Sequence, residues 1–149
     1  MSNYKALYQE VILDHNKKPR NFGTLEHASH QAKGHNPLCG DHINVALQLD
    51  EGGIKSIAFE GESCAICKAS ASMMTVAVKG KTRAEAQTLI DEFLAMATGK
   101  LDLDKPNQIG RLAVFAGVSE LPTRVKCAIL PWHTLHAAMQ SQPDATTEI

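Results

Sequence analysis

An amphipathic stripe marks the start of the chain. Apolar side chains recur there at positions i, i+1, i+4 and i+5, which is the spacing of one face of a helix. The stripe consists of Leu7, Tyr8, Val11 and Ile12. It predicts a helix over residues 4–14, which Pro19 and Gly23 are expected to end.

Residues 41–49 show the other periodicity, with an apolar side chain at every second position. Alternation of this kind predicts a strand with one buried face. The Asp-Glu-Gly-Gly stretch at 50–53 supplies a tight turn, and residues 54–60 return as a second strand. Because an isolated hairpin is only marginally stable, a third strand is needed, and residues 29–34 are the weaker candidate for it.

Helical spacing returns in the second half of the chain. Residues 68–79 are rich in Ala, Ser and Met, and this segment should pack closely against a neighbour. Thr82 and Glu85 have the spacing of a capping box, in which each side chain accepts a hydrogen bond from the other residue's backbone. The apolar stripe that follows consists of Ala86, Leu89, Ile90, Phe93, Leu94 and Ala97. Gly99 is placed to end this helix.

Two further helices are expected near the end, a short one over residues 108–116 and a long one over residues 122–136. Pro131 restricts the long helix, because a proline beyond the first turn removes a hydrogen bond and clashes with the preceding turn. We therefore expect the regular part of that helix to start between residues 126 and 130.

The order of these elements, with strands before most of the helices, favours the α+β class. We expect a small antiparallel sheet of about three strands packed against several helices. A chain of 149 residues fits one domain, which we place at residues 1–140. Residues 141–149 are mostly polar and contain Pro143, so we expect them to form a flexible tail.

The composition excludes several classes of function. Fifteen Lys and Arg against sixteen Asp and Glu give a net charge of −1, which argues against nucleic acid or anionic membranes as partners. Aromatic residues make up 5%, too few for a base-stacking surface. We find neither a bilayer-spanning apolar run nor a secretory pattern, and therefore expect a cytoplasmic protein. Four cysteines in a reducing compartment are more often metal ligands, reactive thiols or buried apolar residues than disulfides.

The first cysteine, Cys39, forms a Cys-Gly-Asp triplet with Gly40 and Asp41. In an extended chain, side chains two positions apart point to the same side, so Cys39 and Asp41 can bind the same metal ion. His35 and His42 flank the triplet, but Asp41 fits this pattern better. The alternative is a loop cysteine beside an aspartate that only caps the strand.

Cys64 and Cys67 form a Cys-x-x-Cys motif between a predicted strand and a predicted helix. The N-terminus of a helix stabilises a thiolate. Three interpretations are open: a redox pair, two metal ligands, or one functional cysteine beside a bystander. The preceding segment is a β-hairpin rather than a βαβ unit, which counts against the redox pair.

Cys127 follows the cations Arg124 and Lys126 at the start of the last predicted helix, where a thiolate is again favoured. A buried apolar cysteine is the alternative. The candidate ligands taken together are Cys39, Asp41, Cys64 and Cys127. Three sulfurs and one oxygen suit zinc, but iron–sulfur clusters also bind thiolates, and spacing alone does not separate the two.

Three separated motifs carry a resemblance to a known family. They are NPLCGD at 36–41, GESCAI at 61–66 with ASASMM at 69–74, and RVKCA at 124–128. The motifs resemble those of iron–sulfur cluster assembly proteins of the IscU and NifU N-terminal type, over residues 4–139. The SufU branch is the closer match, because the stretch between Cys64 and Cys127 is longer than in IscU and Lys126 stands where IscU has histidine.

The resemblance implies an IscU/SufU-like fold and a zinc-bound sulfur acceptor, a carrier rather than an enzyme acting on small molecules. The implied zinc ligands are Cys39, Asp41, Cys64 and Cys127. Cys39 would receive persulfide sulfur from a SufS-like cysteine desulfurase, and the sulfur would pass to a SufBCD-like scaffold, with the protein a monomer when alone. The alternatives are a scaffold that assembles a transient [2Fe–2S] cluster or binds iron on the same ligands, and a thiol redox regulator that uses Cys64 and Cys67.

Two positions depart from the SufU pattern. Cys67 stands where serine is usual, and it is a bystander, an alternative ligand or a second sulfur carrier; we favour the bystander. Ser63 replaces a glycine and restricts the backbone beside Cys64. Arg124 and Lys126 are auxiliary candidates, which either offset the negative charge of the thiolates or are solvated surface cations.

Overall fold

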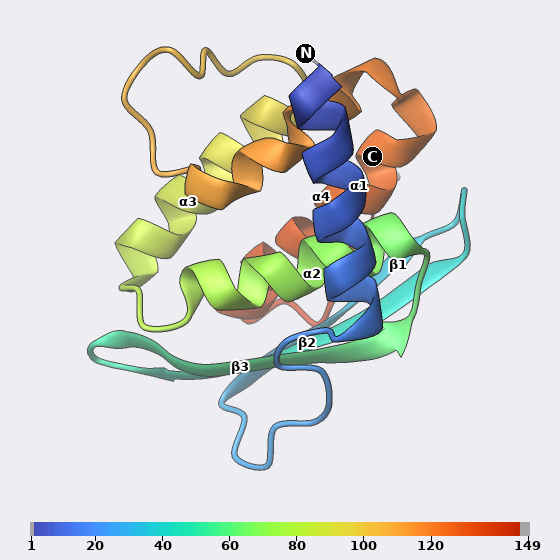
Figure 1. Cartoon of the computed structure of the whole chain (residues 1–149). Helices are drawn as coiled ribbons and strands as arrows, with labels where there is room; N and C mark the ends of the chain where they lie inside the picture. The colour runs from blue at the N-terminus through green and yellow to red at the C-terminus, as the bar shows by residue number, and fades with distance from the viewer. Residues whose placement is uncertain (1, 147–149) are drawn as a thin grey trace.

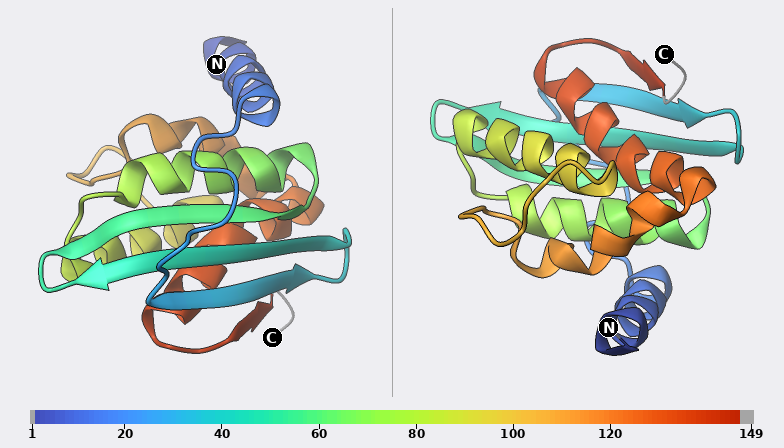
Figure 2. Two further views of the ribbon diagram at one scale, coloured as in Figure 1. Left: turned by 90° about the horizontal axis from the view of Figure 1, so that it is seen from below. Right: turned by 90° about the horizontal axis from the view of Figure 1, so that it is seen from above.

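The computed structural model describes residues 2–146 (Figure 1). A sheet forms one layer and most of the helices form the other, with the N-terminal helix standing at the side of the helical layer (Figure 2). In chain order the elements are α1 (Ser2–Lys17), β1 (His30–Asn36), β2 (Asp41–Asp50), β3 (Gly53–Glu62), α2 (Ala65–Val78), α3 (Arg83–Ala97), the 3-10 helix η1 (Gly110–Glu120), α4 (Pro122–Met139) and β4 (Asp144–Thr146).

The sheet has four strands in the order β3-β2-β1-β4. Strands β1, β2 and β3 are antiparallel neighbours, as the alternating pattern predicted. Their register places Ala32 opposite Val45, and Val45 opposite Phe59, on the face that the helices cover. Helices α2, α3 and α4 lie on that one face, and, of the part of the chain that the structure describes, only the segment between α1 and β1 crosses the other face (Figures 1 and 2).

The fourth strand is where the structure differs from the expected fold. We expected about three strands and a flexible tail, but Asp144–Thr146 pairs in parallel with β1. The Lys33 N–H donates to the carbonyl of Pro143 at 2.8 Å, so the tail forms backbone hydrogen bonds along part of the edge of β1. A polar three-residue strand is too short to leave a periodic pattern. The last part of the predicted tail, residues 147–149, lies outside the described residues.

Helices α2 and α3 lie close to the residue ranges that the sequence pattern predicts for them. The capping box of α3 is confirmed, because the Thr82 and Glu85 side chains each accept a backbone N–H from the other. Gly99 follows the end of α3 with a φ of +78°, a conformation that glycine adopts without strain. Helix α2 starts at Ala65, three residues earlier than predicted, and Cys64 is its N-cap.

Helix α4 contains a proline in its interior, contrary to expectation. It starts at Pro122, a position where proline is favourable, and continues unbroken through Pro131. Pro131 has no N–H to donate to the carbonyl of Cys127, and such a defect costs about 3 kcal/mol. Packing offsets this cost: Trp132 is fully buried, and its ring stacks on Phe93 with the centroids 4.4 Å apart.

The segment predicted as a short helix near residues 108–116 is the 3-10 helix η1. Its Phe115 is buried and contacts Phe93 edge-to-face, with the ring centroids 5.6 Å apart. The loop between α3 and η1 arches away from the helical layer (Figure 1). Across residues 2–146, none of the helices combines the length and the apolar character needed to cross a bilayer.

Candidate metal centre

The tight connection between β1 and β2 carries the first two predicted ligands. Asn36 and Asp41 face each other across the two strands, and the Gly40 N–H donates to the Asn36 carbonyl at 2.8 Å. Gly40 has a φ of +74°, so this turn requires a residue that tolerates the left-handed region. The turn leaves Cys39 exposed and directs Asp41 inward, where its side chain is 1% exposed.

The third predicted ligand, Cys64, lies between β3 and α2. Its backbone N–H donates to Asp41 Oδ1 at 2.8 Å, and its Sγ lies 4.0 Å from Asp41 Oδ2. As the N-cap residue of α2, Cys64 also accepts the backbone N–H of Cys67 at its sulfur, at 3.4 Å. A hydrogen bond from the Cys127 thiol, aided by backbone N–H groups of α2, lowers the pKa of Cys64 to about 7 against the opposing effect of burial.

Cys127, near the start of α4, completes the cluster. Its Sγ lies 3.3 Å from the Cys39 Sγ, and its side chain is fully buried. The pKa of the Cys127 thiol is raised, first because its proton is held in a hydrogen bond to the Cys64 sulfur and then because the thiol is buried. Of these two thiols, Cys64 is therefore the one that ionises more readily.

These donors meet the chemical requirements of a metal site. One ligand atom from each of Cys39, Asp41 and Cys127 lies within 4.8 Å of the others. Cys64 lies beside this group through its contacts with Asp41 and Cys127. Three sulfurs and one carboxylate oxygen, brought from three parts of the chain, suit tetrahedral zinc. The structure thus brings together all four residues that the sequence singled out.

Asn36 is a residue of this site that the sequence analysis missed as a functional candidate. It is fully buried, and its side-chain Nδ2 donates to Asp41 Oδ2 at 3.2 Å and to Cys127 Sγ at 3.7 Å. The signal was present in the alternation of β1, in which Ala32, Gly34 and Asn36 are the inward positions. An asparagine at an inward strand position needs partners, and these partners are two candidate ligands.

The auxiliary candidates Cys67, Arg124 and Lys126 lie close in sequence to the candidate ligands but differ in burial. Cys67 is fully buried within the core, and burial raises its pKa. This thiol is therefore inaccessible to a protein partner and poorly suited to exchange. Arg124 is exposed in the first turn of α4, and Lys126 is half-buried directly before Cys127.

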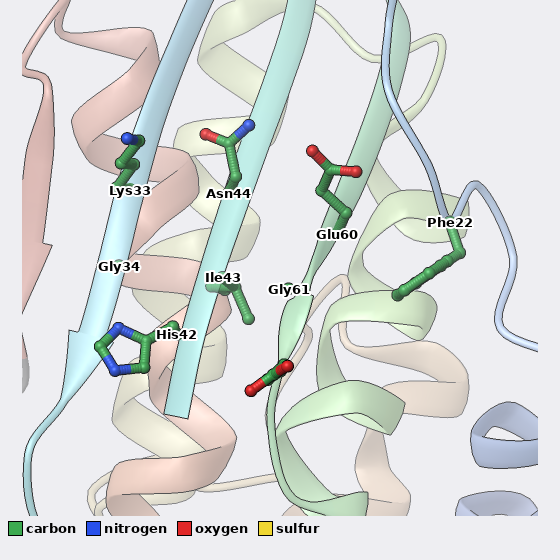
Figure 3. A pocket seen from close by; sticks show the side chains of 9 residues that line it. Phe22, Lys33, Gly34, His42, Ile43, Asn44, Glu60 and Gly61 are labelled. Carbon is green, nitrogen blue, oxygen red and sulfur yellow. The ribbon is translucent and has the colours of Figure 1, made fainter. Parts of the chain in front are cut away.

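The face of the sheet away from the helices carries a different set of side chains (Figure 3). A hollow of about 470 Å³ lies there beside Phe22 and is lined by residues of β1, β2 and β3. His42 lines this hollow, and its ring stacks on that of His35 with the centroids 4.3 Å apart. Since successive residues of a strand face opposite ways, His35 and His42 point away from Asn36 and Asp41.

Comparison with known proteins agrees with this geometry. The chain matches the NifU-like N-terminal domain over residues 7–128. It belongs to this family. The NifU-like match contains all four candidate ligands and also Asn36, since each of them lies between residues 36 and 127.

Relatives of this NifU-like protein carry two kinds of name. The Streptococcus pyogenes serotype M1 protein named iron-sulfur cluster assembly scaffold protein IscU is 38% identical over 145 residues, which cover 97% of this chain and 90% of that one. The Bacillus subtilis (strain 168) protein named zinc-dependent sulfurtransferase SufU is 40% identical over 141 residues, covering 95% of each. The resemblance to iron–sulfur cluster assembly proteins of the IscU and SufU type is therefore confirmed.

A solved structure confirms the α+β fold class. The crystal structure of a putative SUF-system scaffold protein, FiSufU, from Fervidobacterium islandicum AW-1 has a TM-score of 0.82 to this protein. It is 35% identical in sequence, and the match covers 90% of this chain and 97% of that chain. The predicted combination of a small sheet and covering helices is thus the fold of the family, with one more strand than we expected.

Proposed function

We propose that this NifU-like protein is a zinc-bound sulfur acceptor in iron–sulfur cluster assembly. One observation carries the proposal: Cys39 is exposed, whereas its neighbours Asp41 and Cys127 are buried and Cys64 is half-buried. A site that served only to hold a metal would have no need to expose one ligand. The arrangement therefore combines a metal anchor with one thiol that a protein partner can reach.

Zinc fits this donor set, and its ligands would be Cys39, Asp41, Cys64 and Cys127. When bound, zinc keeps thiols deprotonated at neutral pH and performs no redox chemistry of its own. The name of the Bacillus subtilis relative, a zinc-dependent sulfurtransferase, supports this choice of metal. We assign to Arg124 and Lys126, in the first turns of α4, the auxiliary role of offsetting the negative charge of the thiolates.

Sulfur transfer to Cys39 is ordinary thiol exchange with a protein persulfide. The Cys39 thiolate attacks the outer sulfur of a cysteine persulfide on a SufS-like desulfurase. A new S–S bond forms at Cys39 Sγ as the donor's S–S bond breaks, and the donor cysteine leaves as a thiolate, so no external oxidant or reductant is needed. An acceptor thiolate on a SufBCD-like scaffold then attacks the carried sulfur in the same way and regenerates the Cys39 thiolate.

A second candidate function is supported by the relatives named scaffold protein IscU. On this alternative, the same thiols hold a transient [2Fe–2S] cluster. The three cysteines near Asp41 suit such a cluster as well as they suit zinc. Exposure of Cys39 suits both roles, since a transient cluster must also pass to a partner; the similarity to a relative named zinc-dependent sulfurtransferase favours the carrier.

Metal and sulfide analysis of aerobically purified protein tests the proposed function against this alternative. We expect about one zinc per chain, no acid-labile sulfide and a colourless solution. Asp41→Ala and Cys127→Ser should lose most of the zinc, because each variant removes one candidate ligand. A brown protein with iron and sulfide in equal amounts would overturn the carrier in favour of the scaffold.

A further inference from the structure

We propose that Asn36 is a positioning residue for the metal centre, whose side-chain amide holds Asp41 and Cys127 in the arrangement that binds zinc. The inference rests on the proposed function, since it concerns how the same site takes up its metal. It assigns a role to a residue that is itself outside the set of candidate ligands.

Asn36 occupies a place in the sheet from which its side chain reaches both ligands. It is the last residue of β1, its direct partner across the ladder is Asp41, and the long helix α4 brings Cys127 over the same spot. All three side chains are at most 1% exposed, so water does not compete for their hydrogen bonds. The two donor contacts, at 3.2 Å to Asp41 Oδ2 and 3.7 Å to Cys127 Sγ, come from a single nitrogen.

The chemistry of the amide explains why this position suits asparagine. The NH2 group has two hydrogens and no charge, so it can donate to a carboxylate and to a sulfur at the same time. Both neighbours are acceptors, which fixes the amide with its nitrogen toward the cluster. In this orientation a single amide group holds the Asp41 carboxylate and the Cys127 sulfur next to each other, as two ligands of one metal ion must be.

Asn36 also completes a clamp around the Asp41 carboxylate. Oδ1 accepts the backbone N–H of Cys64 at 2.8 Å, and Oδ2 accepts the amide of Asn36 at 3.2 Å. A carboxylate held at both oxygens has little freedom to rotate. The carboxylate is therefore already held in position before the metal binds, so less side-chain conformational entropy is lost on binding. Loss of such an outer hydrogen bond typically weakens metal affinity about 10–100-fold.

Asn36→Leu tests the role with little change of shape, because leucine is close to asparagine in size but has no donor. The affinity for zinc is measured by competition with a chromophoric chelator, starting from protein stripped of metal. We expect zinc to bind Asn36→Leu about 10–100-fold more weakly than wild type. Asn44→Leu is the matched control: Asn44 lies on β2 beside the outer hollow (Figure 3), and this change should leave the affinity within about twofold of wild type.

Cobalt(II) supplies a readout that a purely structural role would not change. Replacement of zinc by cobalt gives thiolate-to-metal charge-transfer bands, and Asn36→Leu should shift or weaken them because Cys127 and Asp41 lose a shared donor. The melting temperature of each metal-free variant identifies any that fails to fold, in which case Asn36→Ala replaces it. Equal zinc affinity and an unchanged cobalt spectrum in a folded Asn36 variant would overturn the role of Asn36 and leave the proposed function intact. Wild-type protein that binds no zinc would overturn the proposed function itself.

Discussion

The sulfur atoms of Cys39 and Cys127 lie 3.3 Å apart, although 88 positions separate the two residues in the chain. The contact joins the turn between β1 and β2 to the start of α4. These two parts meet because α4 packs across β1 on the covered face of the sheet. The site therefore depends on how α4 packs against the sheet. Changes to this packing or to the bound metal should alter the stability of the whole domain.

Removal of the metal should lower thermal stability. Metal that binds the folded protein and not the unfolded chain stabilises it by about 4 kcal/mol when present at about 1,000 times its Kd. For a chain of this size, each kcal/mol shifts the melting temperature by about 2–4 °C. Calorimetry before and after complete chelation should show a fall of about 8–16 °C that added zinc reverses. An unchanged melting temperature would contradict a metal that bridges α4 to the sheet.

Cys67→Ser should leave the metal content unchanged. The Cys67 side chain is fully buried in the core, and the contact with Cys64 comes from its backbone N–H, which serine retains. We expect about one zinc per chain in this variant, measured by atomic absorption. Cys64→Ser is the matched comparison and should lose most of the zinc. Loss of zinc from Cys67→Ser to the same extent would make Cys67 a ligand and not a bystander.

Gly34→Ala should destabilise the contact between β1 and α4. A Cβ at residue 34 would overlap the Thr134 hydroxyl and come within 3.2 Å of Leu130 Cδ1, so the helix must move away from the strand. We expect a loss of about 1–3 kcal/mol in the free energy of unfolding, measured by urea denaturation. Gly117→Ala is the control, since a Cβ there meets nothing within 4 Å. Equal stability of the two variants would contradict this close packing.

The attachment of α1 should depend on pH through His15. His15 Nδ1 lies 2.7 Å from the Oγ of the buried Ser72, which also accepts the backbone N–H of Arg20 at 2.8 Å. The neutral ring can accept the Ser72 hydroxyl at Nδ1, whereas protonation would place a positive charge on a partly buried ring beside Arg20. Burial, with the charge of Arg20, lowers the pKa of His15 below the ordinary histidine value of 6.5.

The sign of this effect follows from proton uptake. Between the lowered pKa of folded His15 and 6.5, the unfolded chain binds more protons than the folded protein, so stability falls as the pH falls through this window. His15→Gln should therefore lose less of its free energy of unfolding than wild type between about pH 8 and about pH 5. The exposed His27 provides the control, and His27→Gln should behave as wild type. The same loss in all three proteins would remove His15 as a cause.

The local elements of the fold could be predicted from the sequence because their signals are local. The alternation of residues 41–49 and the capping pair Thr82 and Glu85 depend on neighbours within a few positions. The interior Pro131 and the short strand β4 depend on tertiary packing instead. In the first case, burial of Trp132 compensates for a lost hydrogen bond, and in the second the exposed edge of β1 recruits a polar segment.

The candidate site likewise contains residues that could be predicted from the sequence and one residue that could not. Cys39, Asp41, Cys64 and Cys127 could be selected because they stand in three short motifs that resemble those of a known family and that combine thiols with a carboxylate two positions from one of them. Asn36 could not be selected on chemistry alone, since an asparagine before a proline is common in turns. Its role depends on a contact with Cys127, 91 positions away, which only the packing of α4 on β1 creates.

The most direct test of the account is to locate the transferred sulfur. Wild-type protein is mixed with a persulfide-loaded cysteine desulfurase, and its cysteine peptides are analysed by mass spectrometry after the remaining thiols are blocked. We predict one added sulfur atom on the Cys39 peptide, transfer to Cys67→Ser as in wild type, and none to Cys39→Ser. Added sulfur on Cys64 or Cys67, or on no cysteine at all, would contradict Cys39 as the sulfur acceptor.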